Sequence, residues 1–103
     1  MSGTQNPYKY QYETVAASQT AQVLGGTGAT GDYLERVIIT VNIAATSTVT
    51  ILDGATSIAL MPAVVGGGVG VYTIPIQCAS ASGPWKITTG AGVTVIGVGI
   101  FSA

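Results

Sequence analysis

A glycine-rich segment in the first third of the chain has the spacing of a dinucleotide-binding loop. Gly26, Gly28 and Gly31 fit the pattern G-x-G-x-x-G, and an acid, Asp53, follows after roughly twenty residues. In proteins that use this pattern, the pyrophosphate binds at the N-terminus of a helix that begins directly after the loop. The segment after this loop is the most strand-like part of the chain. We therefore expect a turn between strands, with no nucleotide and no other cofactor.

The acidic residues offer no pair for general acid–base catalysis. Asp32 and Glu35 flank the start of a predicted strand, three residues apart, so they should lie on opposite faces. Asp53 precedes Gly54 in a dipeptide that is typical of hairpin turns. Glu13 is isolated from the others, whereas a calcium site needs several convergent oxygen ligands. The sequence predicts neither a catalytic pair of carboxylates nor a metal site.

Histidine is absent from the sequence, which removes the commonest general base and the commonest metal ligand. We therefore expect a protein without enzymatic activity. The single cysteine, Cys78, cannot form a disulfide within the chain, and we interpret it as a buried, inert thiol. The alternative is a disulfide to a cysteine of another chain. Trp85 has no second aromatic residue beside it, so we interpret it as a core residue rather than a stacking platform for a ligand.

Charged side chains are scarce. They make up 7% of the chain, against roughly 25% in an average protein, and the net charge is −1. A free monomer keeps a more charged surface, so the deficit indicates that partner subunits cover much of this one. The alternative is a Thr/Ser-rich monomer that its hydroxyl groups keep soluble. No basic patch is present, which argues against nucleic acid as a partner.

The chain shows no sign of membrane insertion or export. Residues 1–7 lack the basic and apolar regions of a signal peptide. The most apolar run, residues 58–75, is interrupted by Pro62, Pro75 and three consecutive glycines, so it does not read as a membrane helix. We therefore expect a protein that is made in a cytoplasm and has no membrane partner.

Residues 33–43 form the strongest predicted strand, because β-branched apolar residues dominate them. A period of two gives this strand one fully apolar face, made of Val37, Ile39, Val41 and Ile43. Its other face is only partly polar, with Leu34, Arg36, Ile38, Thr40 and Asn42. A strand of this kind belongs in the middle of a sheet whose outer side is also partly covered.

Further strands are expected between turn signals that recur every 8–12 residues, at 8–15, 20–24, 48–53, 57–61, 71–78, 85–89 and 93–101. No helix is expected. This spacing predicts an all-β fold, a single-domain β-sandwich or jelly-roll-like barrel of seven to eight mostly antiparallel strands. Residues 1–12 are expected to form an N-terminal arm and residues 13–103 the sandwich domain.

Three details of the strands are predicted as well. Pro75 lacks an N–H group, so its strand should lie at a sheet edge or contain a bulge there. Residues 90–92 should form a hairpin turn between the last two strands. Gly97 and Gly99 share one face of the final strand and leave a groove, which Trp85 is expected to fill.

The residues expected to contact other chains combine exposed apolar or aromatic groups with one pair of charges. Three tyrosines alternate with polar residues near the N-terminus, and tyrosine is favoured at protein interfaces; the alternative is an edge strand that packs them on its own core. Valines occupy an apolar glycine-rich loop, residues 62–70. The charges are either solvated or an intersubunit ion pair. The set comprises Tyr8, Tyr10, Tyr12, Val64, Val65, Val69, Glu35 and Arg36.

Residues 12–39, together with Gly-Pro-Trp-Lys-Ile-Thr-Thr-Gly at 83–90, resemble a group of small structural proteins of tailed bacteriophages. The resemblance covers residues 12–101 and includes no catalytic motif. It implies a virion protein similar to capsid decoration, or cement, proteins, which are often trimers and clamp neighbouring major capsid subunits on the outer surface of the head. The expected partners are therefore the major capsid protein and copies of this chain, as a homotrimer.

The leading expectation is thus a structural virion protein on the capsid surface, made in the cytoplasm of a bacterial host. The alternative is a tail, neck or head-fibre component that binds a host surface or a glycan. Copy number per particle separates the two.

Overall fold

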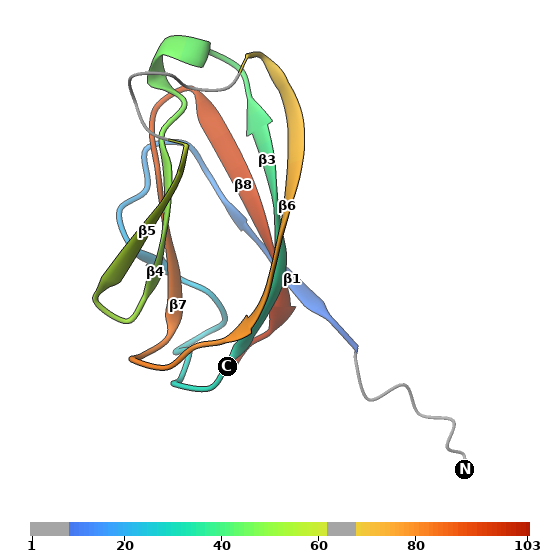
Figure 1. Cartoon of the computed structure of the whole chain (residues 1–103), viewed down its shortest axis with the longest axis vertical. Coiled ribbons are helices and arrows are strands. Elements are labelled where there is room, and N and C mark those ends of the chain that lie inside the picture. The colour runs from blue at the N-terminus through green and yellow to red at the C-terminus, as the bar shows by residue number, and fades with distance from the viewer. Residues whose placement is uncertain (1–8, 62–67) are drawn as a thin grey trace.

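The computed structural model describes residues 9–61 and 68–103, and folds them into two four-stranded antiparallel sheets that face each other (Figure 1). A short 3-10 turn, η1 (Ala44–Thr46), lies between two of the strands. The strands are β1 (Gln11–Val15), β2 (Gln22–Val23), β3 (Tyr33–Val41), β4 (Val49–Asp53), β5 (Thr56–Met61), β6 (Gly70–Ala79), β7 (Trp85–Thr89) and β8 (Val93–Ile100).

The strand order is that of an eight-stranded jelly roll. One sheet runs β1-β8-β3-β6 and the other β2-β7-β4-β5. The first strand pairs with the last, the second with the seventh, the third with the sixth and the fourth with the fifth. This is one long hairpin wound into two Greek keys. The predicted all-β sandwich is confirmed, and within the described residues no α-helix occurs.

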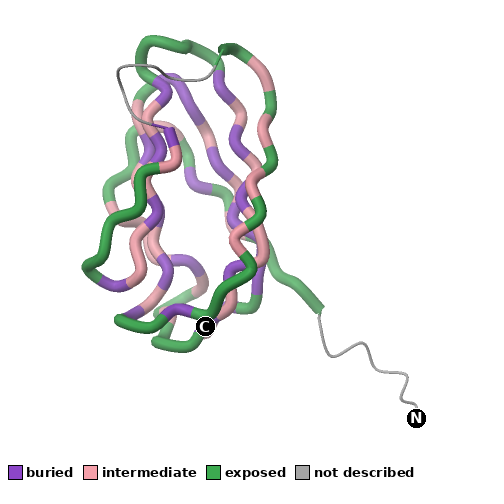
Figure 2. Tube along the Cα trace, in the orientation of Figure 1, coloured by how far each residue is buried: buried purple, intermediate pink, exposed green. Residues whose placement is uncertain are grey.

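The core lies between the sheets and is built mainly from alternate aliphatic residues of the central strands (Figure 2). Val37, Ile39 and Val41 of β3 are fully or almost fully buried, as their spacing predicts. Ile43, the fourth residue expected on this face, lies beyond the end of β3 and is 57% exposed, so that part of the prediction was wrong. Val93 and Val95 of β8 lie beside the buried residues of β3 in the same sheet, and Ile87 of β7 faces them from the opposite sheet; none of the three has exposed surface. Full burial of such a side chain contributes about 1.5–3 kcal/mol, so the period-two pattern accounts for much of the driving force for folding.

A β-bulge at Glu35 changes the faces that a strict alternation predicts for β3. Leu34 pairs with Gly99 of β8 and Arg36 with Val98, so Glu35 is the extra residue. The bulge turns Leu34 into the core, where it is fully buried, and leaves Glu35 and Arg36 together on the outer side. The sequence-based assignment of Leu34 to the outer face was therefore wrong, because an inserted residue resets the alternation.

Strand β6 confirms the prediction for Pro75 but not the one for Cys78. It is an edge strand, and its register shifts where Pro75 pairs with Arg36. Gln77 next to the shift adopts a positive φ of 55°, which breaks the alternation of side chains. Cys78 is therefore exposed instead of continuing the half-buried face of Ile74 and Ile76. The interpretation of Cys78 as a buried thiol was wrong.

The groove beside Gly97 is filled by Leu24, not by Trp85. A Cβ atom placed on Gly97 would lie 2.9 Å from Leu24 Cδ1. Trp85 is a core residue as predicted, 3% exposed, and its Nε1–H donates a hydrogen bond to the Asp32 carbonyl at 2.9 Å. Residues 90–92 do not form a hairpin, because β7 and β8 belong to different sheets. The expected approach of Trp85 to the glycines depended on that hairpin.

The first described strand begins inside the expected arm. Gln11 pairs with Gly99, and Tyr12 with Val98. The Gln11 side-chain oxygen also accepts a hydrogen bond from the Phe101 N–H at 3.0 Å. Residues 11 and 12 are therefore part of the sandwich, and the expected domain boundary after residue 12 falls within β1.

Candidate interaction surface

The outer face of the β1-β8-β3-β6 sheet is broad and carries few charges. Its cross-strand pairs align the outward side chains into three rows that cross the sheet from β6 toward β1. These rows are Val71–Thr40–Thr94, Thr73–Ile38–Ile96–Thr14 and Pro75–Arg36–Val98–Tyr12. Opposite residues in such rows have Cβ atoms about 4.5–5.5 Å apart, so each row is a continuous strip of surface. Aliphatic and aromatic groups dominate the third row.

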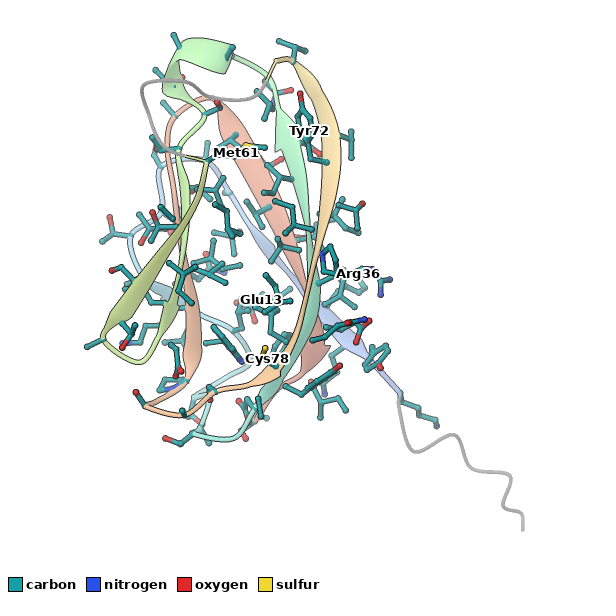
Figure 3. All side chains as sticks on the ribbon, in the orientation of Figure 1. Glu13, Arg36, Met61, Tyr72 and Cys78 are labelled. Carbon is teal, nitrogen blue, oxygen red and sulfur yellow. The ribbon has the colours of Figure 1, made fainter. Side chains whose placement is uncertain are left out.

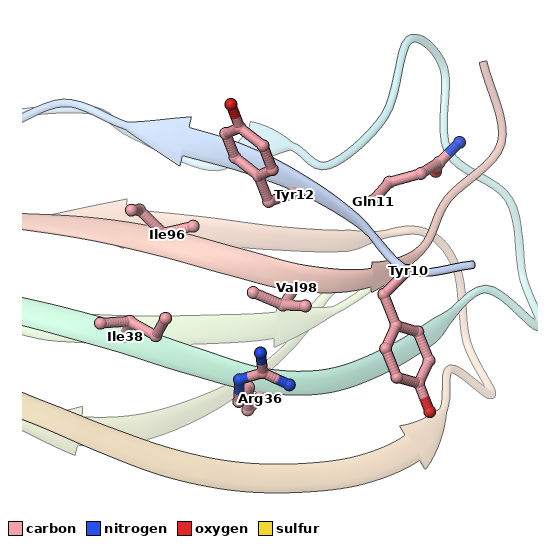
Figure 4. Close-up of a pocket in the computed structure, with 7 residues that line it drawn as sticks. All are labelled: Tyr10, Gln11, Tyr12, Arg36, Ile38, Ile96 and Val98. Atoms are coloured by element: carbon pink, nitrogen blue, oxygen red, sulfur yellow. The ribbon is translucent and has the colours of Figure 1, made fainter. Parts of the chain in front are cut away.

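A shallow hollow of about 550 Å³ lies over the second and third rows (Figure 4). Ile38, Ile96 and Val98 form its apolar floor. Tyr12 stands on the β1 side and Arg36 on the β3 side, whereas Tyr10 closes the end of the hollow where β8 ends. Gln11 completes the lining. Figure 3 shows the Arg36 side chain directed away from the opposite sheet.

Hydrogen bonds and stacking hold the end of the hollow in place. The rings of Tyr10 and Tyr33 stack with centroids 6.2 Å apart. The Tyr33 hydroxyl donates to Glu35 Oε1 at 2.8 Å, and Gln77 Nε2 donates to Glu35 Oε2 at 3.4 Å. The hydrogen bond to Glu35, partial burial and the Glu35 charge together raise the pKa of Tyr33 to about 12. The end of the hollow is thus a preorganised group of side chains.

The two charged residues at the hollow, Glu35 and Arg36, differ in how many hydrogen bonds they form within the protein. Hydrogen bonds, first from Tyr33 and then from Gln77 and Tyr10, lower the pKa of Glu35, and the Arg36 charge adds to this effect. In contrast, no described residue forms a hydrogen bond or an ion pair with the Arg36 guanidinium. Arginine carries five N–H donors in a planar fork. These donors face the hollow and remain available to a partner.

The outer face of the other sheet has a different character. Its outward rows combine Val23, Lys86, Leu52 and Ser57 in one strip and Thr88, Thr50 and Ala59 in the next. Hydroxyl groups and one lysine replace the aromatic residues of the first sheet. The hollow of about 550 Å³ lies on the β1-β8-β3-β6 sheet. The two faces therefore offer unlike surfaces, and the first is the better candidate for binding another chain.

The structure brings four of the eight expected contact residues together. Tyr10 (42% exposed), Tyr12 (73% exposed), Glu35 and Arg36 surround or adjoin the hollow. For Tyr10 and Tyr12, this exposure excludes the alternative that they pack on the protein's own core. Val69 is 71% exposed but lies at the opposite end of the sheet, beside the pair Gly70–Val41. Tyr8, Val64 and Val65 lie outside the described residues.

Sequence reasoning missed the floor of the hollow. Ile38 was assigned to the partly polar face of its strand, and neither it nor Ile96 nor Val98 was given a functional role. The available signal was the largely aliphatic outer set of β8, in which only Thr94 is polar and which includes Ile100 at 38% exposure. A strand with apolar residues on both faces needs cover on its second face as well. What the sequence did not contain was the pairing of β1, β8 and β3.

The glycine loop binds the protein's own C-terminal segment. The N–H groups of Gly26, Thr27 and Gly28 converge on the Ser102 carbonyl oxygen at 3.1, 3.4 and 3.0 Å. The loop leads into strand β3 and not into a helix. Its backbone donors are therefore occupied, and the predicted turn between strands is the correct interpretation of the G-x-G-x-x-G pattern.

The remaining carboxylates are engaged by backbone or side-chain donors. Glu13 accepts hydrogen bonds from Gln22 Nε2 and the Gly25 N–H, each at 2.8 Å. Asp32 accepts from the N–H and hydroxyl of Ser102 at 2.9 and 2.8 Å. Asp53 accepts from the N–H groups of residues 81 and 82, which lower its pKa. Each carboxylate connects segments that are distant in sequence.

Two searches of the described ranges gave negative findings. Over residues 9–61 and 68–103, no three His, Cys, Asp or Glu side chains are grouped so that they could hold a metal ion. In the same ranges, no helix has the length and apolarity needed to cross a membrane. Comparisons of the chain with protein-family models, curated proteins and solved structures found no match. The function is therefore argued from the surface itself.

Proposed function

We propose that this chain is a non-enzymatic structural protein of a bacteriophage particle, located on the outer surface of the capsid. In this role it is a decoration, or cement, protein that binds the major capsid protein and stabilises contacts between neighbouring subunits. It assembles with copies of itself as a homotrimer. The proposal joins the contact surface described above with the resemblance of residues 12–101 to small phage structural proteins.

One observation carries the proposal: the aromatic and aliphatic outer face of the β1-β8-β3-β6 sheet. Tyr12 is 73% exposed, Tyr10 is 42% exposed and Val71 is 65% exposed on or beside this face. Clustered exposed apolar side chains mark interaction sites, whereas single ones are ordinary. Because only 7% of the residues are charged, the surface offers few charges that could keep a protein with such an apolar face soluble. Burial against another protein is the state that this surface favours.

The size of the face suits a contact that is repeated many times. Four strands about 4.8 Å apart and about eight residues long cover roughly 500 Å². A stable one-to-one complex buries about 800 Å² on each partner. A single docked copy would therefore bind weakly, but copies linked in an oligomer bind a repeating lattice with much higher combined affinity. A capsid shell provides such a lattice.

The jelly-roll strand order is compatible with the proposal but does not determine it. This architecture occurs in viral capsid proteins, in lectins and in cupins, and a fold alone does not define function. Catalytic use of the sandwich would require spare titratable groups. The four carboxylates of this chain are instead hydrogen-bonded within the fold, and histidine is absent.

A second candidate function is supported by the aromatic rim of the hollow. Tyr10 and Tyr12 present rings on two sides of an apolar floor, and Arg36 adds donors. Aromatic rings with nearby hydrogen-bond donors also suit a sugar ring. This arrangement fits a tail, neck or head-fibre component that binds a host-surface glycan.

Quantitative mass spectrometry of purified particles tests the proposal. Hundreds of copies per particle are expected for a shell protein, whereas multiples of three or six indicate the tail, neck or fibre alternative. Absence of the chain from purified particles would refute both. Deleting the N-terminal residues is a useful second test only if the deletion ends before Gln11, because Gln11 and Tyr12 pair with β8.

A further inference from the structure

We propose that the hollow between Tyr12 and Arg36 is the docking site for a different protein that presents an apolar side chain beside a carboxylate. The inference rests on the proposed function and names the chemistry of the partner surface. The apolar group would occupy the floor over Ile38 and Ile96, and the carboxylate would pair with the Arg36 guanidinium.

The shape and lining of the hollow support the first feature of the proposed partner, its apolar side chain. Its floor is made only of aliphatic side chains, and Val98 at the centre is 8% exposed. Ile38 and Ile96 are half-buried and pair with each other in the neighbouring row. At about 550 Å³ the hollow has room for one aliphatic or aromatic side chain and part of its backbone. Interfaces place their strongest contacts in such central desolvated pockets, with aromatic residues and arginine around them.

The positive charge of Arg36 supports the second feature of the proposed partner, its carboxylate. Arg36 is the one basic residue within the described rows of this face, and no described residue forms a hydrogen bond or an ion pair with it. The adjacent Glu35 already accepts hydrogen bonds from Tyr33 and Gln77. Guanidinium groups bind carboxylates through two parallel hydrogen bonds, which are stronger once water is excluded. An acidic partner therefore satisfies the donors that the fold leaves open.

The hydrogen bonds that the acidic side chains accept argue against a second copy of this chain as the occupant of the hollow. The sequence has four acidic residues, all of them described. Each one is already positioned by donors of its own chain, as for Glu13 with Gly25, Asp32 with Ser102 and Asp53 with the N–H of residue 82. A copy would have to turn a carboxylate away from these donors, or share its oxygens with them, to reach Arg36. A protein with exposed carboxylates of its own would not.

Matched variants on the two outer faces test the inference. Arg36→Glu reverses the charge at the hollow, and Lys86→Glu makes the same change on the opposite sheet. Ile96→Thr removes apolar floor at a position whose neighbour in β8, Thr94, is already threonine. Leu52→Thr is its control on the opposite face. The purified full-length variants are checked for folding by circular dichroism and thermal unfolding before use.

The probe is the capsid of the encoding phage, assembled from a genome that lacks this gene. Wild type, Lys86→Glu and Leu52→Thr are expected to bind with the same affinity, whereas Arg36→Glu and Ile96→Thr should lose about tenfold or more. Equal binding by Arg36→Glu and Lys86→Glu would overturn the inference and leave the proposed function intact. Failure of wild type to bind would overturn both.

Sedimentation velocity of the same proteins separates the two possible occupants. Arg36→Glu and Ile96→Thr are expected to leave the oligomeric state of the free protein unchanged. A shift to smaller species in these variants, absent from Lys86→Glu and Leu52→Thr, would mean that a second copy occupies the hollow. That result would overturn the inference even if capsid binding were also lost.

Discussion

Leu24 fills the gap that Gly97 leaves on the core face of β8. Leu24 has no exposed surface, and a Cβ atom on Gly97 would lie 2.9 Å from its Cδ1 and 3.5 Å from Ile87 Cδ1. The absence of a side chain at residue 97 therefore makes room for a leucine from the loop between β2 and β3. This contact joins the two sheets at the point where the core would otherwise be open.

This relationship predicts a compensating pair of substitutions. Leu24→Ala should lower the free energy of unfolding by about 2–5 kcal/mol, because it opens a cavity. Gly97→Ala should cost about 1–3 kcal/mol by overpacking. The double variant should recover part of the loss, since the new methyl group enters the vacated space. Urea denaturation measures all three.

Gly99→Ala is the control for that pair. A Cβ atom at residue 99 would meet the Tyr33 carbonyl oxygen and would lie 3.0 Å from Leu34 Cα, both of which are backbone atoms. Shortening Leu24 should therefore give no recovery in this background. Equal recovery for Gly97→Ala and Gly99→Ala would contradict the assigned role of Leu24.

Asp32 and Ser102 are expected to act as one unit. Asp32 is 9% exposed and accepts both the N–H and the hydroxyl of Ser102. Asp32→Ala leaves these donors and the Ala29 N–H without their acceptor, at a cost of about 1–3 kcal/mol. Ser102→Ala removes one hydrogen bond and should cost about 0.5–1.5 kcal/mol. In the double variant the loss of unfolding free energy should be smaller than the sum of the two single losses. Chemical denaturation measures all three variants, and strictly additive losses would contradict the coupling of Asp32 with Ser102.

Asp53 should make the stability depend on acidic pH. The N–H groups of Ser82 and Ala81 lower its pKa in the folded protein below the ordinary value of 3.8. Its contribution is therefore complete above the unfolded-state pKa and is lost as the pH falls through the folded-state value. Asn at residue 53 retains the turn preference before Gly54 while removing the charge.

We therefore expect Asp53→Asn to be less stable than wild type at neutral pH, with a difference that shrinks as the pH falls below about 4. Urea denaturation at a series of pH values measures this. A difference between wild type and Asp53→Asn that stays constant down to about pH 2 would show that the charge of Asp53 makes no contribution.

Tyr33 should ionise well above the ordinary tyrosine pKa of 10.0. Its hydrogen bond to Glu35 is the main cause that raises its pKa from 10.0 to about 12. Tyr33→Phe should remove the component near 12 from the alkaline titration. Glu35→Gln should shift that component back toward 10.0, whereas Glu13→Gln, which changes a carboxylate bonded to Gln22 and Gly25, should not. Ultraviolet difference absorbance follows the titration.

Cys78 should react in the folded protein. Its side chain is exposed, and its Sγ–H donates only a weak hydrogen bond to the Ile76 carbonyl, with the two atoms 3.1 Å apart. A disulfide reagent such as Ellman's reagent should modify one thiol per chain without denaturant, at a rate close to that of the unfolded protein. Cys78→Ser provides the blank. A thiol that reacts only in denaturant would contradict the exposed position.

The sequence alone determined the local features of this fold. Period two in residues 37–41 identified the core face of β3, because alternate side chains of a strand point to opposite sides. Asp53-Gly54 identified the hairpin between β4 and β5, where Gly54 has a φ of 61°. Pro75 identified an edge or a bulge. Such features depend on neighbours in the chain, so they can be read without knowing which strands pair.

Tertiary structure decided everything that depends on pairing between distant segments. The bulge at Glu35 exists because β3 must match Gly99 and Val98 of β8, and it turned Leu34 inward and left Glu35 beside Arg36 on the outer side. Leu24, and not Trp85, fills the space beside Gly97, because β7 and β8 belong to different sheets. The hollow itself combines residues from β1, β3 and β8. Because those strands are far apart in sequence, no local pattern encodes their register, and only the assembled sheet brings Tyr12 and Arg36 to one site.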